Sequence, residues 1–153
     1  MRSLEPWVEA PLTEFLAESG ARITLLMTSS GQVVAQHGFT RSLDVMAAAA
    51  LGAGIMAATG ELAKLLGAAS LPAVTHQGKL LGVYLAAFGT PRGRWLGLVV
   101  YGSETSLGMV QLFFARLAEE LARVAPAEAP GGRVLAENFE DELNSSLRSL
   151  FGR

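Results

Sequence analysis

The segment that most constrains the fold runs from Val45 to Gly60 and contains no charged side chain. Asp44 precedes it and is a good helix N-cap, and Gly67 lies where a left-handed residue would end a helix. The Ala and Leu residues between them favour one helix of roughly 22 residues, about 33 Å long. A helix that packs on a sheet and faces water with its other side should carry charges on that outer side. Another surface should therefore cover this helix.

We expect small residues to line the outer side of the helix, so that another backbone can approach closely. These residues are Ala48, Ala49, Gly52, Ala53, Ala57 and Gly60. Glycine inside a helix costs up to about 1 kcal/mol relative to alanine, and close packing would offset that cost. A helix buried within its own protomer is the alternative, but a chain of 153 residues has few elements left to cover a second face. Pairing of the same helix in two copies is the simplest solution, so the sequence predicts a homodimer.

The rest of the chain alternates between helical and extended patterns. Apolar residues at three- and four-residue spacing predict a helix over about 10–19, which Gly20 should end. A second amphipathic pattern predicts a helix over 106–124. Short turns separate the expected strands, which are 22–28, 32–37, 72–76, 80–88 and 95–101. The order α-β-β-α-β-β-β-α predicts an α+β sandwich with a five-stranded, mainly antiparallel sheet.

One domain followed by a short tail is the expected organisation. Residues 1–125 hold the predicted sandwich. Residues 126–136 include the run Pro130-Gly131-Gly132 and are typical of a linker. Over 137–153, apolar residues recur at helical spacing and predict a C-terminal amphipathic helix. They are Phe139, Leu143, Leu147, Leu150 and Phe151.

Charge and composition argue against several classes of function. The formal net charge is -2 and the basic residues are scattered, so we expect no nucleic-acid partner. The absence of cysteine excludes disulfides, thiol nucleophiles and cysteine metal sites. The N-terminus lacks the apolar run of a signal peptide, and the uncharged stretch is too short and too rich in Gly and Ala for a membrane span. We therefore expect a cytoplasmic protein.

Two motifs suggest cofactor or metal binding but lack the required context. Residues 52–57 match the relaxed dinucleotide fingerprint G-x-G-x-x-A, yet that motif must follow a strand and open a helix, and this one lies in mid-helix. The only histidines are His37 and His76, which are too few for a zinc site. We expect no cofactor and no metal.

Candidate catalytic residues are equally sparse. Ser106 is better explained as the N-cap of the last core helix than as a nucleophile. Arg92 and Arg94 lie in a predicted loop and could act as an arginine finger on a GTPase, but exposed loop arginines are usually only solvated charges. The sequence therefore predicts a protein regulator without an active site of its own, rather than an enzyme.

Three segments resemble one known family. The run from Ala53 to Gly67 is similar to the central helix of bacterial Roadblock proteins. The triplet His76-Gln77-Gly78 before a strand and the segment 105–112 at the start of the last core helix support the match. Over about residues 5–125 the chain resembles the Roadblock/dynein light chain family. It is most similar to the MglB-like members, which regulate the small Ras-like GTPase MglA and also carry a C-terminal helix.

The resemblance implies a homodimer that presents both long helices to one MglA-like GTPase and reshapes its switch loops without supplying a catalytic group. The residues that it places against the GTPase are Ala57, Glu61, Lys64, Leu147, Leu150 and Phe151. The residues expected at the dimer interface are Ala48, Gly52, Ile55, Met56 and Thr59. Ile55 departs from the family pattern, because MglB-like chains tend to have a polar residue there.

A second class of function stays open. The chain could be a non-catalytic Roadblock scaffold in a cytoplasmic polarity or motility complex, with no effect on nucleotide turnover. Deleting residues 133–153 would separate the two classes, since only a regulator would lose an effect on turnover. A ligand sensor has little support, because no cluster of polar residues converges in the sequence.

Overall fold

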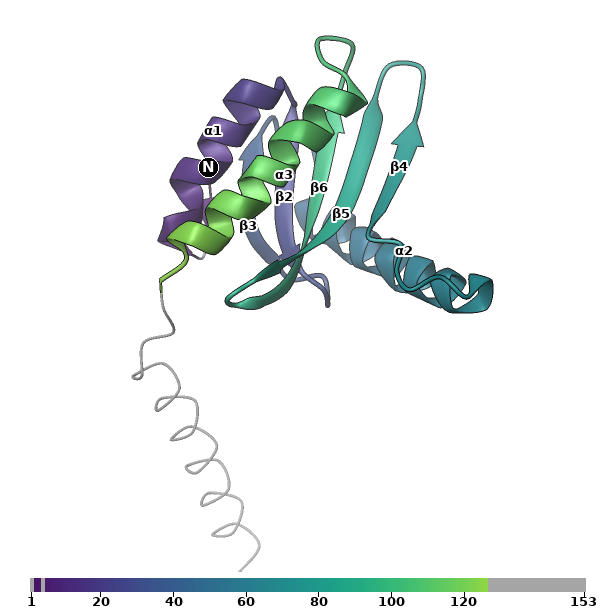
Figure 1. The fold of residues 1–153 in the computed structure, drawn as a ribbon. Coiled ribbons are helices and arrows are strands. Elements are labelled where there is room, and N and C mark those ends of the chain that lie inside the picture. Colours follow the sequence, from purple (N-terminus) through teal and green to yellow (C-terminus); the bar gives the residue numbers. More distant parts are fainter. Residues whose placement is uncertain (1, 4, 127–153) are drawn as a thin grey trace, which may run out of the picture.

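The computed structural model describes residues 2, 3 and 5–126. Its middle layer is a six-stranded antiparallel sheet in the order β1-β3-β2-β6-β5-β4. The strands are β1 (Arg2–Ser3), β2 (Ile23–Thr28), β3 (Val33–Gly38), β4 (Ala73–Gln77), β5 (Gly82–Thr90) and β6 (Gly93–Tyr101). The helices are the 3-10 turn η1 (Pro6–Val8), α1 (Glu9–Ser19), α2 (Val45–Leu66) and α3 (Leu107–Val124). Figure 1 shows α1 and α3 on one face of the sheet and α2 on the other.

The predicted element order and the α+β class are confirmed. The structure adds β1, a two-residue strand that pairs with β3 and makes the sheet six-stranded. So short a strand carries no alternating pattern that sequence analysis could detect. Pro11 lies in the first turn of α1, where its missing N–H breaks no helical hydrogen bond.

The predicted helix ends are confirmed at the level of single atoms. The Asp44 side chain accepts a hydrogen bond from the backbone N–H of Ala47 at 3.0 Å, and Ser106 Oγ accepts one from Met109 N–H at 3.3 Å. Gly67 (φ 69°) and Gly20 (φ 72°) are in the left-handed conformation that ends α2 and α1.

Two apolar cores lie on the two faces of the sheet. Between the sheet and the α1–α3 layer, Phe114 packs edge-on against Phe15, Tyr84 and Phe88. A side chain at Gly97 of β6 would overlap the Phe114 ring, so glycine is required there for α3 to approach the sheet. The smaller core under α2 is built from Leu25, Met27, Ala49 and Leu96. The core between α2 and the sheet therefore contains far fewer buried residues than the core under α1 and α3.

The predicted tail lies outside the described residues. The described chain ends just after α3, at Pro126, the first residue of the expected linker. The expected C-terminal helix over 137–153, with Leu147, Leu150 and Phe151, therefore stays a prediction.

Candidate functional site

The most unusual surface of the described domain is the outer side of α2. We call it the α2 face and define it by the exposed residues of that helix, which are Met46, Ala47, Ala50, Leu51, Gly54, Ala57, Ala58, Gly60, Glu61, Leu62, Lys64, Leu65 and Leu66. Three of its large apolar side chains, Met46, Leu51 and Leu65, are 79%, 69% and 85% exposed. Apolar patches of this kind mark interaction sites on proteins that are otherwise well packed.

The opposite side of α2 corrects part of the expected arrangement. Ala49 and Gly52 were expected on the outer side, but both are buried against the sheet. A methyl group at Gly52 would meet Met27 Sδ and Leu98 Cδ1 at 3.5 Å, which is ordinary van der Waals distance. The sequence could not separate the two sides of this helix because small residues occur on both. Gly52, predicted at the dimer interface, is therefore in contact with its own sheet.

The other glycines of α2 face open space. Apart from the adjoining backbone of α2 itself, no heavy atom of the described domain lies within 4 Å of a methyl group built on Gly54 or Gly60. Neither glycine is thus required by packing inside the protomer, although each weakens the helix by about 1 kcal/mol relative to alanine. Of the small residues expected on the outer side, Ala57 and Gly60 are exposed there, whereas Ala48 and Ala53 are half-buried against the smaller core; the exposed Gly54 was not among them.

The helix residues predicted to contact a GTPase share one stripe of the α2 face. Ala57, Glu61 and Lys64 follow one another at four- and three-residue spacing, and all three are exposed. Lys64 Nζ lies 3.1 Å from Glu61 Oε1, with 76% and 73% of the two side chains exposed. So exposed a pair contributes little to stability and remains available to a partner.

The residues predicted at the dimer interface lie closer to the sheet. Ala48, Ile55, Met56 and Thr59 are half-buried, and Ala48 and Met56 pack against the smaller core. The Thr59 hydroxyl donates to the carbonyl of Ile55 at 2.7 Å, so this side chain is already satisfied within the helix. A second copy could reach the exposed parts of these residues only at the border between α2 and the sheet.

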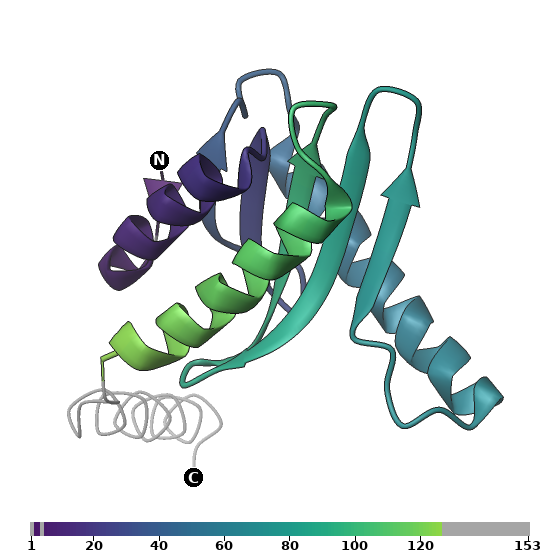
Figure 2. The same ribbon diagram turned by 45° about the horizontal axis from the view of Figure 1, so that its top comes forward.

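A free sheet edge lies beside that border. β4 is the last strand of the sheet, and four of its five residues are exposed. Figures 1 and 2 show that α2 crosses behind the sheet and extends past β4. An edge strand with unpaired N–H and C=O groups can accept another strand. The α2 face and the β4 edge can therefore both contact the same neighbouring chain.

Sequence analysis did not identify the large apolar residues of the α2 face. Met46, Leu51, Leu62, Leu65 and Leu66 are all exposed. Their spacing resembles that of core residues. The one available signal was that α2 has more large apolar residues than the few elements packed against it can bury.

Ser106 forms the predicted helix cap, and the nearby Glu104 is held in an ion pair with Arg22. Glu104 accepts two hydrogen bonds from Arg22, at 2.7 and 3.1 Å, which lower the pKa of the carboxyl group. Burial lowers the pKa of His37 because it disfavours the charged ring, and His76 lies exposed on β4. Within residues 2, 3 and 5–126, no three His, Asp or Glu side chains are grouped closely enough to hold a metal ion.

One helix of the described domain has the length and composition of a membrane span. This helix is α2, with 22 residues and a mean hydropathy of 1.5. It is longer than the uncharged stretch, because it continues through Glu61 and Lys64. Its N-cap bond at Asp44 and its packing on the sheet through Ala49 and Ala63 are features of a helix that belongs to a folded domain.

Comparisons with known proteins agree on one family. Residues 8–90 match the Roadblock/LC7 domain family. The structure is similar to MglB of Myxococcus xanthus, with 29% identity, a TM-score of 0.72, and coverage of 78% of this chain and 94% of that one. It is also similar to the gliding protein MglB of Thermus thermophilus, with 34% identity, a TM-score of 0.70, and coverage of 82% and 93%. An MglB structure with a tetrameric arrangement is 36% identical, with a TM-score of 0.69 and coverage of 77% and 87%. The comparison with curated proteins gave no match.

Proposed function

The chain belongs to the Roadblock/LC7 family, and from this we propose that it is a homodimeric regulator of a small Ras-like GTPase of the MglA type. It acts by reshaping the switch loops of the GTPase and supplies no catalytic residue, so it is not itself an enzyme. We place it in the cytoplasm, with no bound cofactor. The similarity to MglB proteins over most of the chain supports this choice within the family.

The observation that carries the proposal is the uncovered α2 face. A monomer would leave Met46, Leu51 and Leu65 in water, each more than two thirds exposed. Burying such a side chain stabilises an assembly by about 1.5–3 kcal/mol, so three of them in each copy favour association. The thin core under α2 and the open glycines at positions 54 and 60 point the same way.

Two different surfaces of the dimer follow from this arrangement. The β4 edge, the adjoining border of α2 with Ile55, Met56 and Thr59, and the neighbouring part of the α2 face with Leu51 and Gly54 contact the second copy. The stripe of Ala57, Glu61 and Lys64 then remains on the outside of the dimer for the GTPase. A tetrameric arrangement of one MglB protein supports the capacity of this fold to self-associate.

The tail has a separate role in this proposal. Leu147, Leu150 and Phe151 form an apolar stripe in the sequence and contact a second surface of the GTPase, where they adjust affinity or nucleotide exchange. Deletion of residues 133–153 should then reduce the effect on turnover while the dimer persists.

Light scattering and GTP turnover test the proposal together. The purified chain should behave as a dimer and bind one MglA-like GTPase loaded with a GTP analogue, but not the GDP-loaded form. It should also accelerate GTP hydrolysis. The Ala57→Arg variant should remain dimeric and lose the GTPase, because a long charged side chain enters the proposed contact stripe.

The matched control is Ala115→Arg, which makes the same change at an exposed position of α3 on the opposite side of the sheet. This variant should bind the GTPase as the unmodified chain does. Equal loss in both variants would contradict the assignment of the contact stripe. A dimer that ignores the GTPase in both nucleotide states would contradict the regulatory function and favour the scaffold.

A further inference from the structure

A pocket of about 610 Å³ lies between β3, the loop 39–44 and the first turn of α2. Every residue that lines it is exposed or half-buried, so its walls are free to contact a ligand. We call it the β3–α2 pocket. Its lining includes the apolar residues Val33, Leu43 and Met46 and the polar residues Gln36, Arg41 and Asp44. Pockets of this size commonly hold small molecules.

The β3–α2 pocket lies apart from the two surfaces that the proposed dimer and its GTPase use. Three strands separate β3 from β4 in the sheet, which places them about 19 Å apart at the usual strand spacing (Figure 1). Met46 precedes Ala57 by about three turns of α2, or about 16 Å. A ligand in the pocket would therefore leave the β4 edge and the contact stripe uncovered.

Two opposite charges line the pocket without pairing with each other. Arg41 and Asp44 are both exposed, and neither takes part in an ion pair among the described residues. One carboxylate oxygen of Asp44, Oδ1, accepts the capping hydrogen bond from the N–H of Ala47. The other carboxylate oxygen and the Arg41 guanidinium are therefore available to a ligand that carries both charges.

The side chain of Gln36 points to the same kind of ligand. Gln36 is opposite Leu25 in the strand register, and Leu25 belongs to the core under α2, so both side chains lie on that side of the sheet. Gln36 Oε1 is buried and has no hydrogen-bond partner in the described part of the chain. A buried carbonyl oxygen without a donor is unfavourable, and a rotation of the amide toward a ligand N–H group would satisfy it. A ligand sensor had little support from the sequence, because the side of the sheet on which Gln36 lies follows only from the register.

Apolar side chains complete the pocket. Val33 and Leu43 are half-buried and pack against the smaller core, and Met46 is 79% exposed. The flexible methionine side chain can fold over an apolar group that enters the pocket. The pocket thus combines a cation, an anion, a carbonyl oxygen without a donor and an apolar wall.

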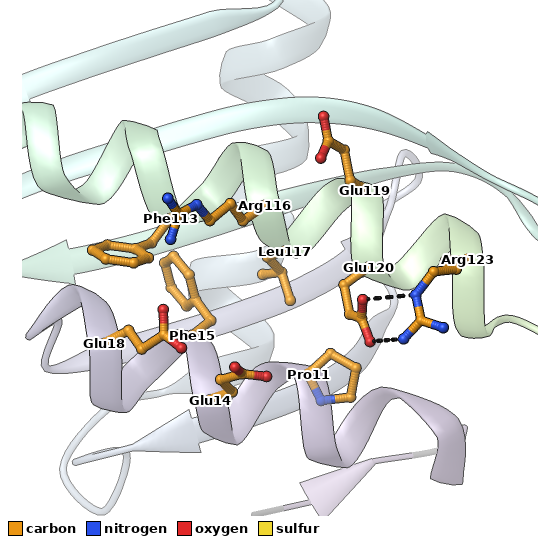
Figure 3. A pocket seen from close by; sticks show the side chains of 10 residues that line it. All are labelled: Pro11, Glu14, Phe15, Glu18, Phe113, Arg116, Leu117, Glu119, Glu120 and Arg123. Atoms are coloured by element: carbon orange, nitrogen blue, oxygen red, sulfur yellow. Dashed lines mark hydrogen bonds and ion pairs between the residues drawn. The ribbon is translucent and has the colours of Figure 1, made fainter.

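A groove of about 490 Å³ between α1 and α3 lacks this combination. Figure 3 shows Arg123 beside Glu120, to which it donates two hydrogen bonds, so this cation is already paired. The side that α1 contributes has an acidic rim, and the apolar side chains of Phe15 and Leu117 are buried in the core. We therefore assign no ligand to this groove.

We propose that the β3–α2 pocket binds a small zwitterion, an α-amino acid with an apolar side chain. The ligand carboxylate accepts hydrogen bonds from the Arg41 guanidinium, whose planar fork matches a carboxylate. The ligand ammonium group donates to the free oxygen of Asp44 and to the amide oxygen of Gln36. The apolar side chain of the ligand lies against Leu43 and Met46. This site does not depend on the GTPase-regulating function proposed above.

Isothermal titration calorimetry on the full chain tests the proposal, with L-leucine and L-methionine as probes. Saturable binding of one amino acid per chain is the expected result. N-acetyl-L-leucine lacks the ammonium group and L-leucinamide lacks the carboxylate. Each analogue should bind at least about tenfold more weakly than L-leucine, because each loses a charge-assisted contact.

Two substitutions assign these contacts to the protein. Arg41→Gln and Asp44→Ser should each weaken the binding of L-leucine at least about tenfold. Serine at position 44 still caps α2, so the fold should persist while the carboxylate is lost. L-leucinamide should bind Arg41→Gln as it binds the unmodified chain, because it never contacts that guanidinium. The matched control is Arg92→Gln, at an exposed arginine outside the pocket, and it should bind L-leucine normally.

Three results would overturn the proposal. The absence of saturable binding for both amino acids would mean that the pocket does not hold this class of ligand. Undiminished binding in both Arg41→Gln and Asp44→Ser would place the ligand elsewhere. Equal affinity for N-acetyl-L-leucine and L-leucine would mean that the protein recognises an anion and not a zwitterion. Dimerisation and GTP turnover are measured in separate assays, so each of these results leaves the proposed regulatory function intact.

Discussion

Replacing Gly54 with alanine separates the stability of the protomer from that of the proposed dimer. Within one protomer, a methyl group at this position meets no heavy atom within 4 Å. The substitution should therefore strengthen α2 by the ordinary difference in helix propensity, about 1 kcal/mol. In a protein that uses Gly54 only as an exposed helix position, this gain would be the whole effect.

If a second protomer packs closely against Gly54, the same substitution weakens the dimer although it stabilises the protomer. Forcing a methyl group into a close contact costs about 1–3 kcal/mol, and a symmetric dimer contains the substitution twice. The expected loss is then about 2–6 kcal/mol for each dimer. About 1.4 kcal/mol corresponds to a tenfold change in affinity. The dissociation constant of the dimer should therefore rise more than about tenfold relative to the unmodified protein.

Two assays measure the two effects separately. Sedimentation equilibrium over a range of concentrations gives the dimer dissociation constant, and urea unfolding under dissociating conditions gives the stability of the protomer. Gly108→Ala is the matched control, because it adds a methyl group to an exposed glycine of α3 with no atom closer than 4.0 Å. A Gly54→Ala protein that is more stable and dimerises as tightly as before would refute the close approach at this position.

Three further predictions concern the fold. Gly97→Ala should lower the free energy of unfolding by about 1–3 kcal/mol in urea titrations, because the new methyl group overlaps the buried Phe114 ring; unchanged stability would contradict the packing. Asp44→Ala should cost about 1 kcal/mol in the same assay through loss of the helix cap, and Asp44→Ser should recover most of it. Arg22→Ala should destabilise the protein slightly at neutral pH. Because the pKa of Glu104 is lowered in the folded state, the ion pair stabilises the protein above the ordinary glutamate pKa and this stabilisation is lost as the pH falls through the lowered value. The stabilities of the two proteins should therefore converge in acid. A difference that persists in acid would contradict the ion pair as its cause.

The family and the order of elements could be predicted because they depend on local patterns. The caps Asp44 and Ser106 lie within three residues of the N–H groups that they bind, and Gly20 and Gly67 end their helices through their own backbone angles. Such interactions need no knowledge of the rest of the chain. The stripe of Ala57, Glu61 and Lys64 was likewise predictable, since helical periodicity places the three residues on one side.

The orientation of α2 could not be predicted in this way. A helix with small residues on every side lacks the contrast between apolar and charged faces that tells which side meets the sheet. Contact with Met27, Leu85 and Leu98 places Gly52 inside and leaves Gly54 outside. That choice depends on side chains from three strands far away in the sequence.

The sequence by itself determined where the helices and strands lie, where they end, and that the long helix carries no charge from Val45 to Gly60. Only the tertiary structure decided that α2 extends past the free β4 edge, and that the acidic rim of α1 meets α3 across a groove. The physical reason is the separation in sequence between the residues that interact. Caps, turns and periodicity act over a few residues, whereas an exposed face or a groove is defined by what the remaining elements leave uncovered.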